Sequence, residues 1–249
     1  GANSTLKSEA QVHELLPDME AARYSVARVK VGERRRNPSP PFTTSTLQQE
    51  ASRRLGFTAK RTMATAQQLY EGIEVGDGQP TGLITYMRTD STNISAGAQT
   101  EARQFVTDRY GPTYLPESAP QYKTRAKGAQ EAHEAVRPTQ VDREPKALAE
   151  FLSRDQLKLY TLIWQRFLAS QMAPALYDTL SVEILARGAL RQYLFRVSGS
   201  TLKFAGFLAV YEEARDEDQA VDEEAEARTL PPLTADEALS LMRLWPEQH

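Results

Sequence analysis

Two short segments carry side chains suited to chemistry on a phosphate. The first, GLITYMRTDS at residues 82–91, places Arg88 two positions after Tyr86. The second, QEAHEAVRP at residues 130–138, contains His133. A phenol is protonated near neutral pH, so as a nucleophile it needs neighbouring positive charge, which a guanidinium supplies together with a bidentate grip on a phosphate. The Tyr–Arg pair is therefore suited to a nucleophile that acts beside a bound phosphate.

Tyr86 itself has two interpretations. It lies in the apolar run of residues 83–87, which predicts a short β-strand, and a tyrosine in such a strand is ordinarily half-buried in a core. Because side chains alternate along a strand, Tyr86 and Arg88 share one face. The neighbouring guanidinium favours the interpretation of Tyr86 as a nucleophile. Asp90 and Ser91 are interpreted as turn or cap residues rather than acid–base groups.

His133 is predicted to lie in a short Ala/Glu helix that stops before Pro138. A capping or core histidine is the ordinary role in such a helix. The alternative is a protonated imidazole, favoured by Glu131 and Glu134 if these are close in space, which pairs with a phosphate and orders a bound strand. Arg137 would either hold this helix or contact a phosphate.

Composition removes several classes of site. The 249 residues include no cysteine and three histidines, which excludes disulfides, thiolate zinc sites, a Cys nucleophile and a His-rich metal centre. With a mean hydropathy of −0.53 and no apolar run long enough to span a bilayer, an integral membrane protein is also excluded. No secretory signal is visible, so we expect a reducing, cytoplasmic location.

Charge is distributed unevenly. The net charge is −3, yet residues 212–227 (EEARDEDQAVDEEAEA) are strongly acidic and predict a loop that forms no core. Three successive arginines at 34–36 would either contact phosphates or simply be the solvated end of a strand. The chain starts without Met and ends on WPEQH, so we expect a piece of a longer protein.

Apolar periodicity indicates helices in the middle of the chain and strands at both ends. The predicted helices are a capped helix from Ser8 toward Ala22 that contains Pro17, one capped by Ser45 and stopped by Gly56, one from Thr58 to Tyr70, one through Ala98 and Val106 that ends at Gly111, and one from Leu157 to Gln171. The predicted strands cover residues 24–31, 83–87, 179–185, 193–197, 202–211 and, more weakly, 238–244. The helices on either side of Gly56 form a helix-turn-helix-like pair, which suits DNA but also any bundle. The aromatic stripe Tyr160, Trp164 and Phe167 is interpreted as core packing.

This order predicts an α+β, multidomain fold. Residues 1–42 and 171–249 would form a discontinuous antiparallel β-sheet domain, into which a mainly helical domain of residues 43–170 is inserted. The Pro-rich stretch at 37–41 cannot be helix interior or central strand, so it is expected to be a stiff connector. Hinge motion would use residues 37–43 and 171–176.

Together with PFTTSTLQQEA at residues 41–51, the two chemistry-bearing segments closely resemble bacterial type IA DNA topoisomerases. The resemblance runs along essentially the whole chain, including YLPES at 114–118 and YTLIW at 160–164. It implies an internal fragment of the family's arch, with a β-rich hinge or gate domain and a helical domain that carries the active-site tyrosine. It further implies that Tyr86 attacks a single-strand phosphodiester and becomes joined to the 5′ phosphate, and that Arg88 contacts this phosphate. His133 would lie beside the tyrosine and contact DNA.

The same resemblance implies the reaction and its partners. The parent enzyme would relax negatively supercoiled DNA by single-strand cleavage, strand passage and religation, near the nucleoid and without ATP, for which no P-loop is present. Mg²⁺ would be held by a toprim domain that this sequence lacks, so the expected metal ligands here are none, Asp216 and Asp218 included. Partners would be single-stranded DNA and the missing toprim and downstream domains, and the fragment alone would be inactive. The alternative is a non-catalytic module that binds single strands or docks a partner, with Tyr86 inert.

Overall fold

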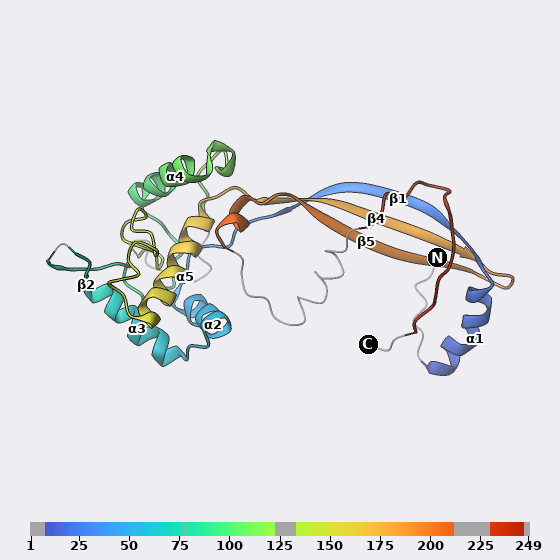
Figure 1. Cartoon of the computed structure of the whole chain (residues 1–249), viewed down its shortest axis with the longest axis horizontal. Helices are drawn as coiled ribbons and strands as arrows, with labels where there is room; N and C mark the ends of the chain where they lie inside the picture. Colours follow the sequence, from blue (N-terminus) through green and yellow to red (C-terminus); the bar gives the residue numbers. More distant parts are fainter. Residues whose placement is uncertain (1–7, 77, 123–132, 212–229, 247–249) are drawn as a thin grey trace. The chain divides into compact units, whose positions relative to one another are not determined.

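The computed structural model describes residues 8–76, 78–122, 133–211 and 230–246 (Figure 1). Their contacts divide them into two compact units. The sheet unit comprises the described residues up to Arg34, those from Tyr177 to Leu202 and those beyond residue 229. The helical unit comprises Arg35–Leu176 and the described residues from Lys203 to Tyr211. The α+β fold class predicted from the sequence is confirmed.

The main sheet has four strands in the order β5-β4-β1-β6. They are β1 (Arg23–Arg36), β4 (Ala175–Arg187), β5 (Gln192–Phe204) and the two-residue β6 (Ala238–Leu239). β1 pairs antiparallel with β6, Tyr24 opposite Leu239. The strand predicted over 202–211 is wrong: β5 continues to Phe204, and a 3-10 turn, η2 (Gly206–Ala209), follows it.

Helix α1 (Glu9–Glu20) is anchored on the turn between β4 and β5. Ser8 caps it, as predicted, and the helix continues through Pro17 as one piece. The Asp18 carboxylate accepts hydrogen bonds from the backbone N–H groups of Leu190 and Arg191 and from the hydroxyl of Tyr193. These bonds, that from Leu190 first, lower the pKa of Asp18. The carboxylate thus holds the turn against the helix.

The helical unit contains α2 (Thr44–Leu55), α3 (Ala59–Glu71), α4 (Ala96–Tyr110) and α5 (Arg154–Ser170), with a 3-10 turn, η1 (Pro112–Tyr114), after α4. α2 is capped by Thr43 rather than by the predicted Ser45. The side chains of Thr43 and Thr46 each accept a hydrogen bond from the other's backbone N–H, so the helix starts two residues earlier than predicted. It ends, as predicted, at Gly56, whose φ is 65°.

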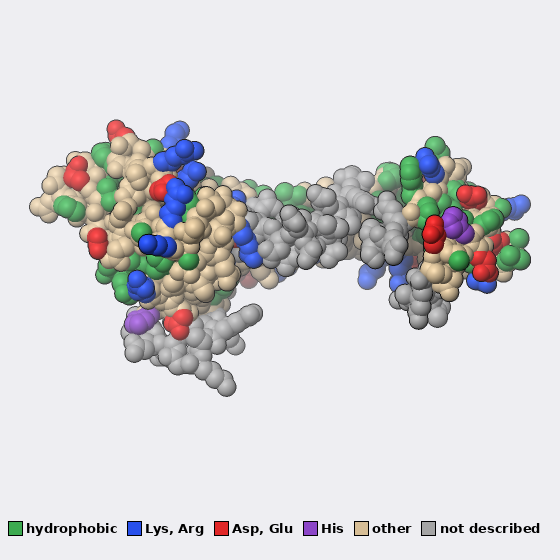
Figure 2. Space-filling view, turned by 90° about the horizontal axis from the view of Figure 1, so that it is seen from below, with side chains coloured by type: hydrophobic (Ala, Val, Ile, Leu, Met, Phe, Trp, Pro, Cys, Tyr) green, Lys and Arg blue, Asp and Glu red, His purple; other side chains and the backbone are tan. Residues whose placement is uncertain are grey.

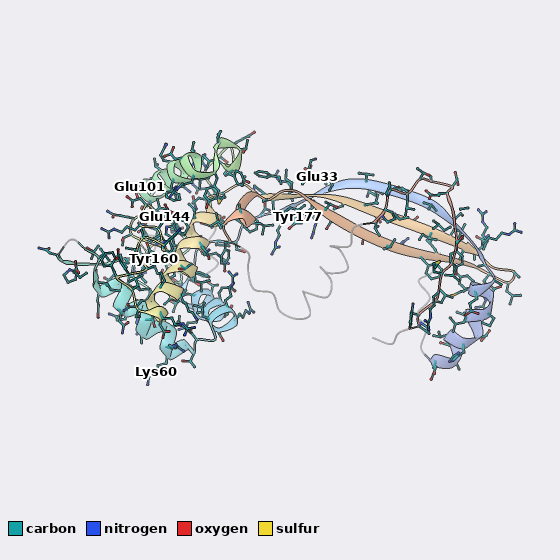
Figure 3. All side chains as sticks on the ribbon, in the orientation of Figure 1. Glu33, Lys60, Glu101, Glu144, Tyr160 and Tyr177 are labelled. Carbon is teal, nitrogen blue, oxygen red and sulfur yellow. The ribbon has the colours of Figure 1, made fainter. Side chains whose placement is uncertain are left out.

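Helix α5 supplies the centre of this unit's core (Figure 3). Its aromatic stripe is buried, which confirms the packing interpretation: Tyr160, Trp164 and Phe167 are each less than 10% exposed. The two polar tips are satisfied by backbone, since the Tyr160 hydroxyl donates to Arg143 O and the Trp164 indole to Val141 O. Burial raises the pKa of Tyr160. No helix among the described residues is long and apolar enough to cross a membrane.

Candidate active site

The segment that carries Tyr86 is extended but is not the strand that the sequence predicts. A small hairpin of β2 (Ile73–Glu74) and β3 (Pro80–Thr81) leads into it, and its one ladder contact is an isolated bridge between Ile84 and Pro138. Burial nevertheless alternates along it: Met87 is fully buried, whereas Tyr86 is 50% exposed and Arg88 is exposed. The predicted sharing of one face by Tyr86 and Arg88 therefore holds without a regular strand.

Thr85 fixes the segment on the N-terminal side of Tyr86. Its N–H donates to Arg137 O at 2.9 Å, and its hydroxyl donates to Ala135 O at 2.7 Å. The hydroxyl also accepts from the N–H of Arg137 at 3.0 Å. One threonine thus ties the backbone next to Tyr86 to the segment that follows His133.

The residues from His133 to Pro138 do not form the predicted helix. They run extended, because their backbone groups pair with distant segments: Ala135 N–H donates to Asn93 O, and Val136 N–H donates to Phe42 O, each at 2.8 Å. His133 itself is exposed. Glu131 lies outside the described residues, as does the acidic segment 212–227.

Glu134 is engaged by other partners than His133. Its carboxylate accepts from the Arg137 guanidinium at 2.8 Å and from Ser95 N–H at 2.7 Å. Burial alone would raise the pKa of Glu134, but these hydrogen bonds and the Arg137 charge outweigh burial and hold the pKa below its usual range. The carboxylate therefore serves the fold rather than the imidazole.

Arg137 points into the protein. It is 9% exposed and donates to Pro138 O, Ser95 and Glu134. Its Nε has no hydrogen-bond partner among the described residues. The sequence left two roles open for Arg137, holding its own segment or contacting a phosphate. These contacts support the first.

Tyr86, Arg88 and His133 line one open pocket of about 310 Å³. The other lining residues are Tyr70, Thr85, Thr89 and Glu134. The structure thus brings all three predicted site residues together, although His133 lies 47 positions from Tyr86 in the chain. On the visible face of the helical unit, Figure 2 shows several Lys and Arg side chains, with Asp and Glu side chains among them.

Tyr70, at the end of α3, is a pocket residue that sequence reasoning missed. Its ring packs edge-on against that of Tyr86, with centroids 5.3 Å apart. No sequence signal links the two segments. Only the structure shows that Gly82 passes so close to the end of α3 that an added Cβ would lie 2.8 Å from Tyr70 O. A helical period alone presents Tyr70 as an ordinary helix residue.

The site offers no ready place for a metal. Among the residues described here, no three His, Cys, Asp or Glu side chains gather as ligands. Among the described residues that line the pocket, Glu134 carries the one carboxylate, and it already accepts a hydrogen bond from Arg137. The described residues of this site therefore do not offer the carboxylate ligands that a bound Mg²⁺ takes.

A family model described as DNA topoisomerase matches residues 1–249. The chain is 49% identical over 227 residues to DNA topoisomerase 1 of Xylella fastidiosa, in strains Temecula1 and 9a5c, which covers 91% of this chain and 27% of each relative. Full-length topoisomerase I from Thermotoga maritima matches with a TM-score of 0.73 and 35% identity, over 95% of this chain and 35% of that one. The chain thus spans 27% of the length of the curated relatives that it matches. It belongs to the bacterial type IA DNA topoisomerase family.

Proposed function

We propose that this chain is the part of a DNA topoisomerase that carries the nucleophile, and that Tyr86 is the nucleophile. The observation that carries the proposal is the open pocket shared by Tyr86, Arg88 and His133. The phenol is half exposed, so a DNA strand has access to it. By contrast, Tyr160 and Tyr211 are buried, and their hydroxyls donate to protein oxygens.

In this proposal the reaction is a transesterification. The Tyr86 oxygen forms a bond to the phosphorus of a single-stranded phosphodiester, and the bond from phosphorus to the 3′ oxygen of the preceding nucleotide breaks. The phenolic proton is lost, and the leaving 3′ oxygen takes up a proton. The 5′ phosphate stays on Tyr86, so religation is the same step in reverse and needs no ATP. Arg88, next to the phenol on the outward side, would hold the phosphate and offset its developing charge.

His133 is the second residue proposed to contact the bound strand. It lies on the pocket rim, exposed, and its neighbour Glu134 is held by Arg137. A protonated imidazole there would pair with a phosphate flanking the cleaved bond. We propose that Mg²⁺ is held by another part of the full-length enzyme.

The whole cycle belongs to the longer protein. We propose that it relaxes negatively supercoiled DNA in the cytoplasm, at the nucleoid, with the sheet unit acting as the hinge domain and the helical unit carrying the tyrosine. This chain alone is expected not to relax DNA. A pure binding module would share the pocket but form no covalent bond.

The test is covalent capture. A chain that carries these residues together with the segments found in the longer relatives is mixed with Mg²⁺ and a single-stranded oligonucleotide labelled at its 3′ end, then run on a denaturing gel. We expect the label to stay on the protein, because the 5′ end of the labelled fragment is joined to Tyr86. Tyr86→Phe should bind the oligonucleotide as before and abolish the adduct.

Tyr110→Phe is the matched control. It removes a phenolic hydroxyl from α4, outside the pocket, and keeps the ring contact with Tyr114. The adduct should persist at its original yield. Capture that survives in Tyr86→Phe would show that another group is the nucleophile.

A further inference from the structure

Helix α2 begins directly against the Tyr86 segment, at Thr44. The Thr44 hydroxyl donates to Met87 O at 2.7 Å and accepts from the N–H of Thr89 at 2.8 Å. The Thr44 N–H donates to Thr89 O, also at 2.8 Å. One residue, more than forty positions earlier in the chain, thus binds the backbone on both sides of Arg88.

These contacts fix the backbone of Arg88 in particular. Met87 C=O belongs to the peptide group before Arg88, and Thr89 N–H belongs to the peptide group after it. Both planes are tied to the same oxygen atom, so rotation about φ and ψ of Arg88 is restrained together. These two angles set the direction of the Cα–Cβ bond. The Arg88 side chain therefore leaves the backbone in a fixed direction, although the side chain itself is exposed.

Thr44 is itself held rigidly. It is the first residue of α2, whose reciprocal cap of Thr43 and Thr46 fixes the first turn, and Leu47 in the next turn is fully buried. A β-branched side chain has few χ1 rotamers, so the hydroxyl keeps its position. The first turn of α2 therefore restrains the backbone of Arg88 through Thr44.

We propose that Thr44 is a positioning residue for Arg88. It touches no substrate. Its hydroxyl holds the guanidinium where it meets the phosphate that Tyr86 attacks. The inference rests on the proposed function, and it adds α2 to the parts of the molecule on which cleavage depends.

The experiment compares Thr44→Val with Thr44→Ser in the longer chain used for covalent capture. Valine keeps the shape and removes the hydroxyl, whereas serine keeps the hydroxyl. With single-turnover cleavage of a labelled oligonucleotide, we expect Thr44→Val to lower the rate constant about tenfold or more, because small misplacements of a group at a reacting centre have effects of this size. Thr44→Ser should restore most of the rate, and the dissociation constant for the oligonucleotide should change by less than about threefold in both, since the other phosphate contacts remain.

Thr62→Val is the matched control. Thr62 is a fully buried threonine of α3 whose hydroxyl donates to Thr58 O, and it makes no contact with the pocket. Thr62→Val removes a hydroxyl from the same helical unit, and cleavage by this variant should keep the original rate. Two results would overturn the inference: Thr62→Val slows cleavage as much as Thr44→Val, or Thr44→Ser fails to restore the rate. In either case the slowing would not come from loss of the Thr44 hydroxyl, which bonds Met87 O and Thr89 N–H.

A second measurement does not depend on activity or on any variant. In the unsubstituted chain, amide hydrogen exchange should show the Thr89 N–H protected, since it is bound to the Thr44 hydroxyl. Unprotected exchange at Thr89 would overturn the inference even if Thr44→Val failed to fold.

Different results would refute the role of Thr44 and the proposed function. No adduct in the unsubstituted enzyme refutes both, whereas normal cleavage by Thr44→Val, with Tyr86→Phe inactive, refutes the role of Thr44 alone.

Discussion

At the scale of single residues, the pocket separates side chains that face solvent from side chains that hold the site together. Tyr86, Arg88 and His133 are exposed, whereas Thr85, Glu134 and Arg137 are bonded to backbone or to one another. The types and spacing of the first group are visible in the sequence. The second group is recognised only in three dimensions, because threonine and glutamate at these positions have no distinguishing pattern.

Glu134 illustrates the cost of removing such a supporting residue. Its ion pair with Arg137 is mostly buried, and Glu134→Gln would leave the guanidinium with a weaker partner. We expect the free energy of unfolding at pH 7 to fall by about 1–3 kcal/mol, the usual range for a poorly satisfied buried polar group. The measurement is urea unfolding, followed by the fluorescence of Trp164 in a Trp245→Phe background.

The same pair predicts a pH dependence. The pKa of Glu134 is lowered in the folded state, so its contribution is complete above the unfolded pKa of about 4.3 and is lost as pH falls through the lower folded value. The stability difference between the original chain and Glu134→Gln should therefore shrink as pH drops below about 4. Glu150→Gln, at an exposed position, should change stability by less than about 0.5 kcal/mol at pH 7. A difference that stays constant with pH would contradict the assignment.

At the scale of elements, local signals succeeded where an element is determined locally. Gly56, Thr58 and Ser8 end or begin helices at the predicted places, because caps and left-handed glycines act within a few residues. The extended segment after His133 could not be predicted, since its hydrogen bonds go to Phe42, Asn93 and Thr85. An Ala/Glu composition favours a helix, and these distant backbone partners override that preference.

Two glycines of the helical unit test the local argument. At Gly56 the φ of 65° disfavours a side chain, although nothing lies within 4 Å of an added Cβ. Gly56→Ala should therefore destabilise by about 1 kcal/mol through backbone strain alone. Gly97, inside α4, has equally open space and no such φ, so Gly97→Ala should stabilise by about 0.5–1 kcal/mol. Urea unfolding measures both, and equal signs for the two changes would contradict the argument.

At the scale of the whole molecule, the chain enters the helical unit more than once. The sequence assigns everything after residue 171 to the β-rich domain, but the described residues from Lys203 to Tyr211 pack with the helices. Phe207 and Tyr211 are less than 5% exposed. Periodicity could not reveal this return, because it reports the type of an element and not the neighbours against which it packs.

Within the returning segment, residues 203–211, Phe207 and Tyr211 are hydrogen-bonded to other parts of the helical unit. Phe207 N–H donates to Ala173 O at 2.9 Å, just after α5. The Tyr211 hydroxyl donates to the buried Glu50 carboxylate of α2 at 2.7 Å, and the Arg166 guanidinium lies 5.5 Å from the Tyr211 ring centroid. Burial, and then the bond to Glu50, raises the pKa of Tyr211, so this hydrogen bond persists at neutral and mildly alkaline pH.

These contacts predict that the helical unit needs residues 203–211 but not residues 177–202. Because Ala173 and Phe207 share a hydrogen bond, a Gly/Ser linker of about eight residues is long enough to join residue 176 to residue 203. A chain of residues 35–176 linked in this way to 203–211 should fold. The same linked chain with Phe207→Ala and Tyr211→Ala should lose at least about 3 kcal/mol, which corresponds to a Tm lower by roughly 6–12 °C, because two buried aromatic rings are removed. Thermal unfolding monitored by circular dichroism measures the difference, and identical melting of the two linked chains would show that the returning segment contributes nothing to the unit that carries Tyr86.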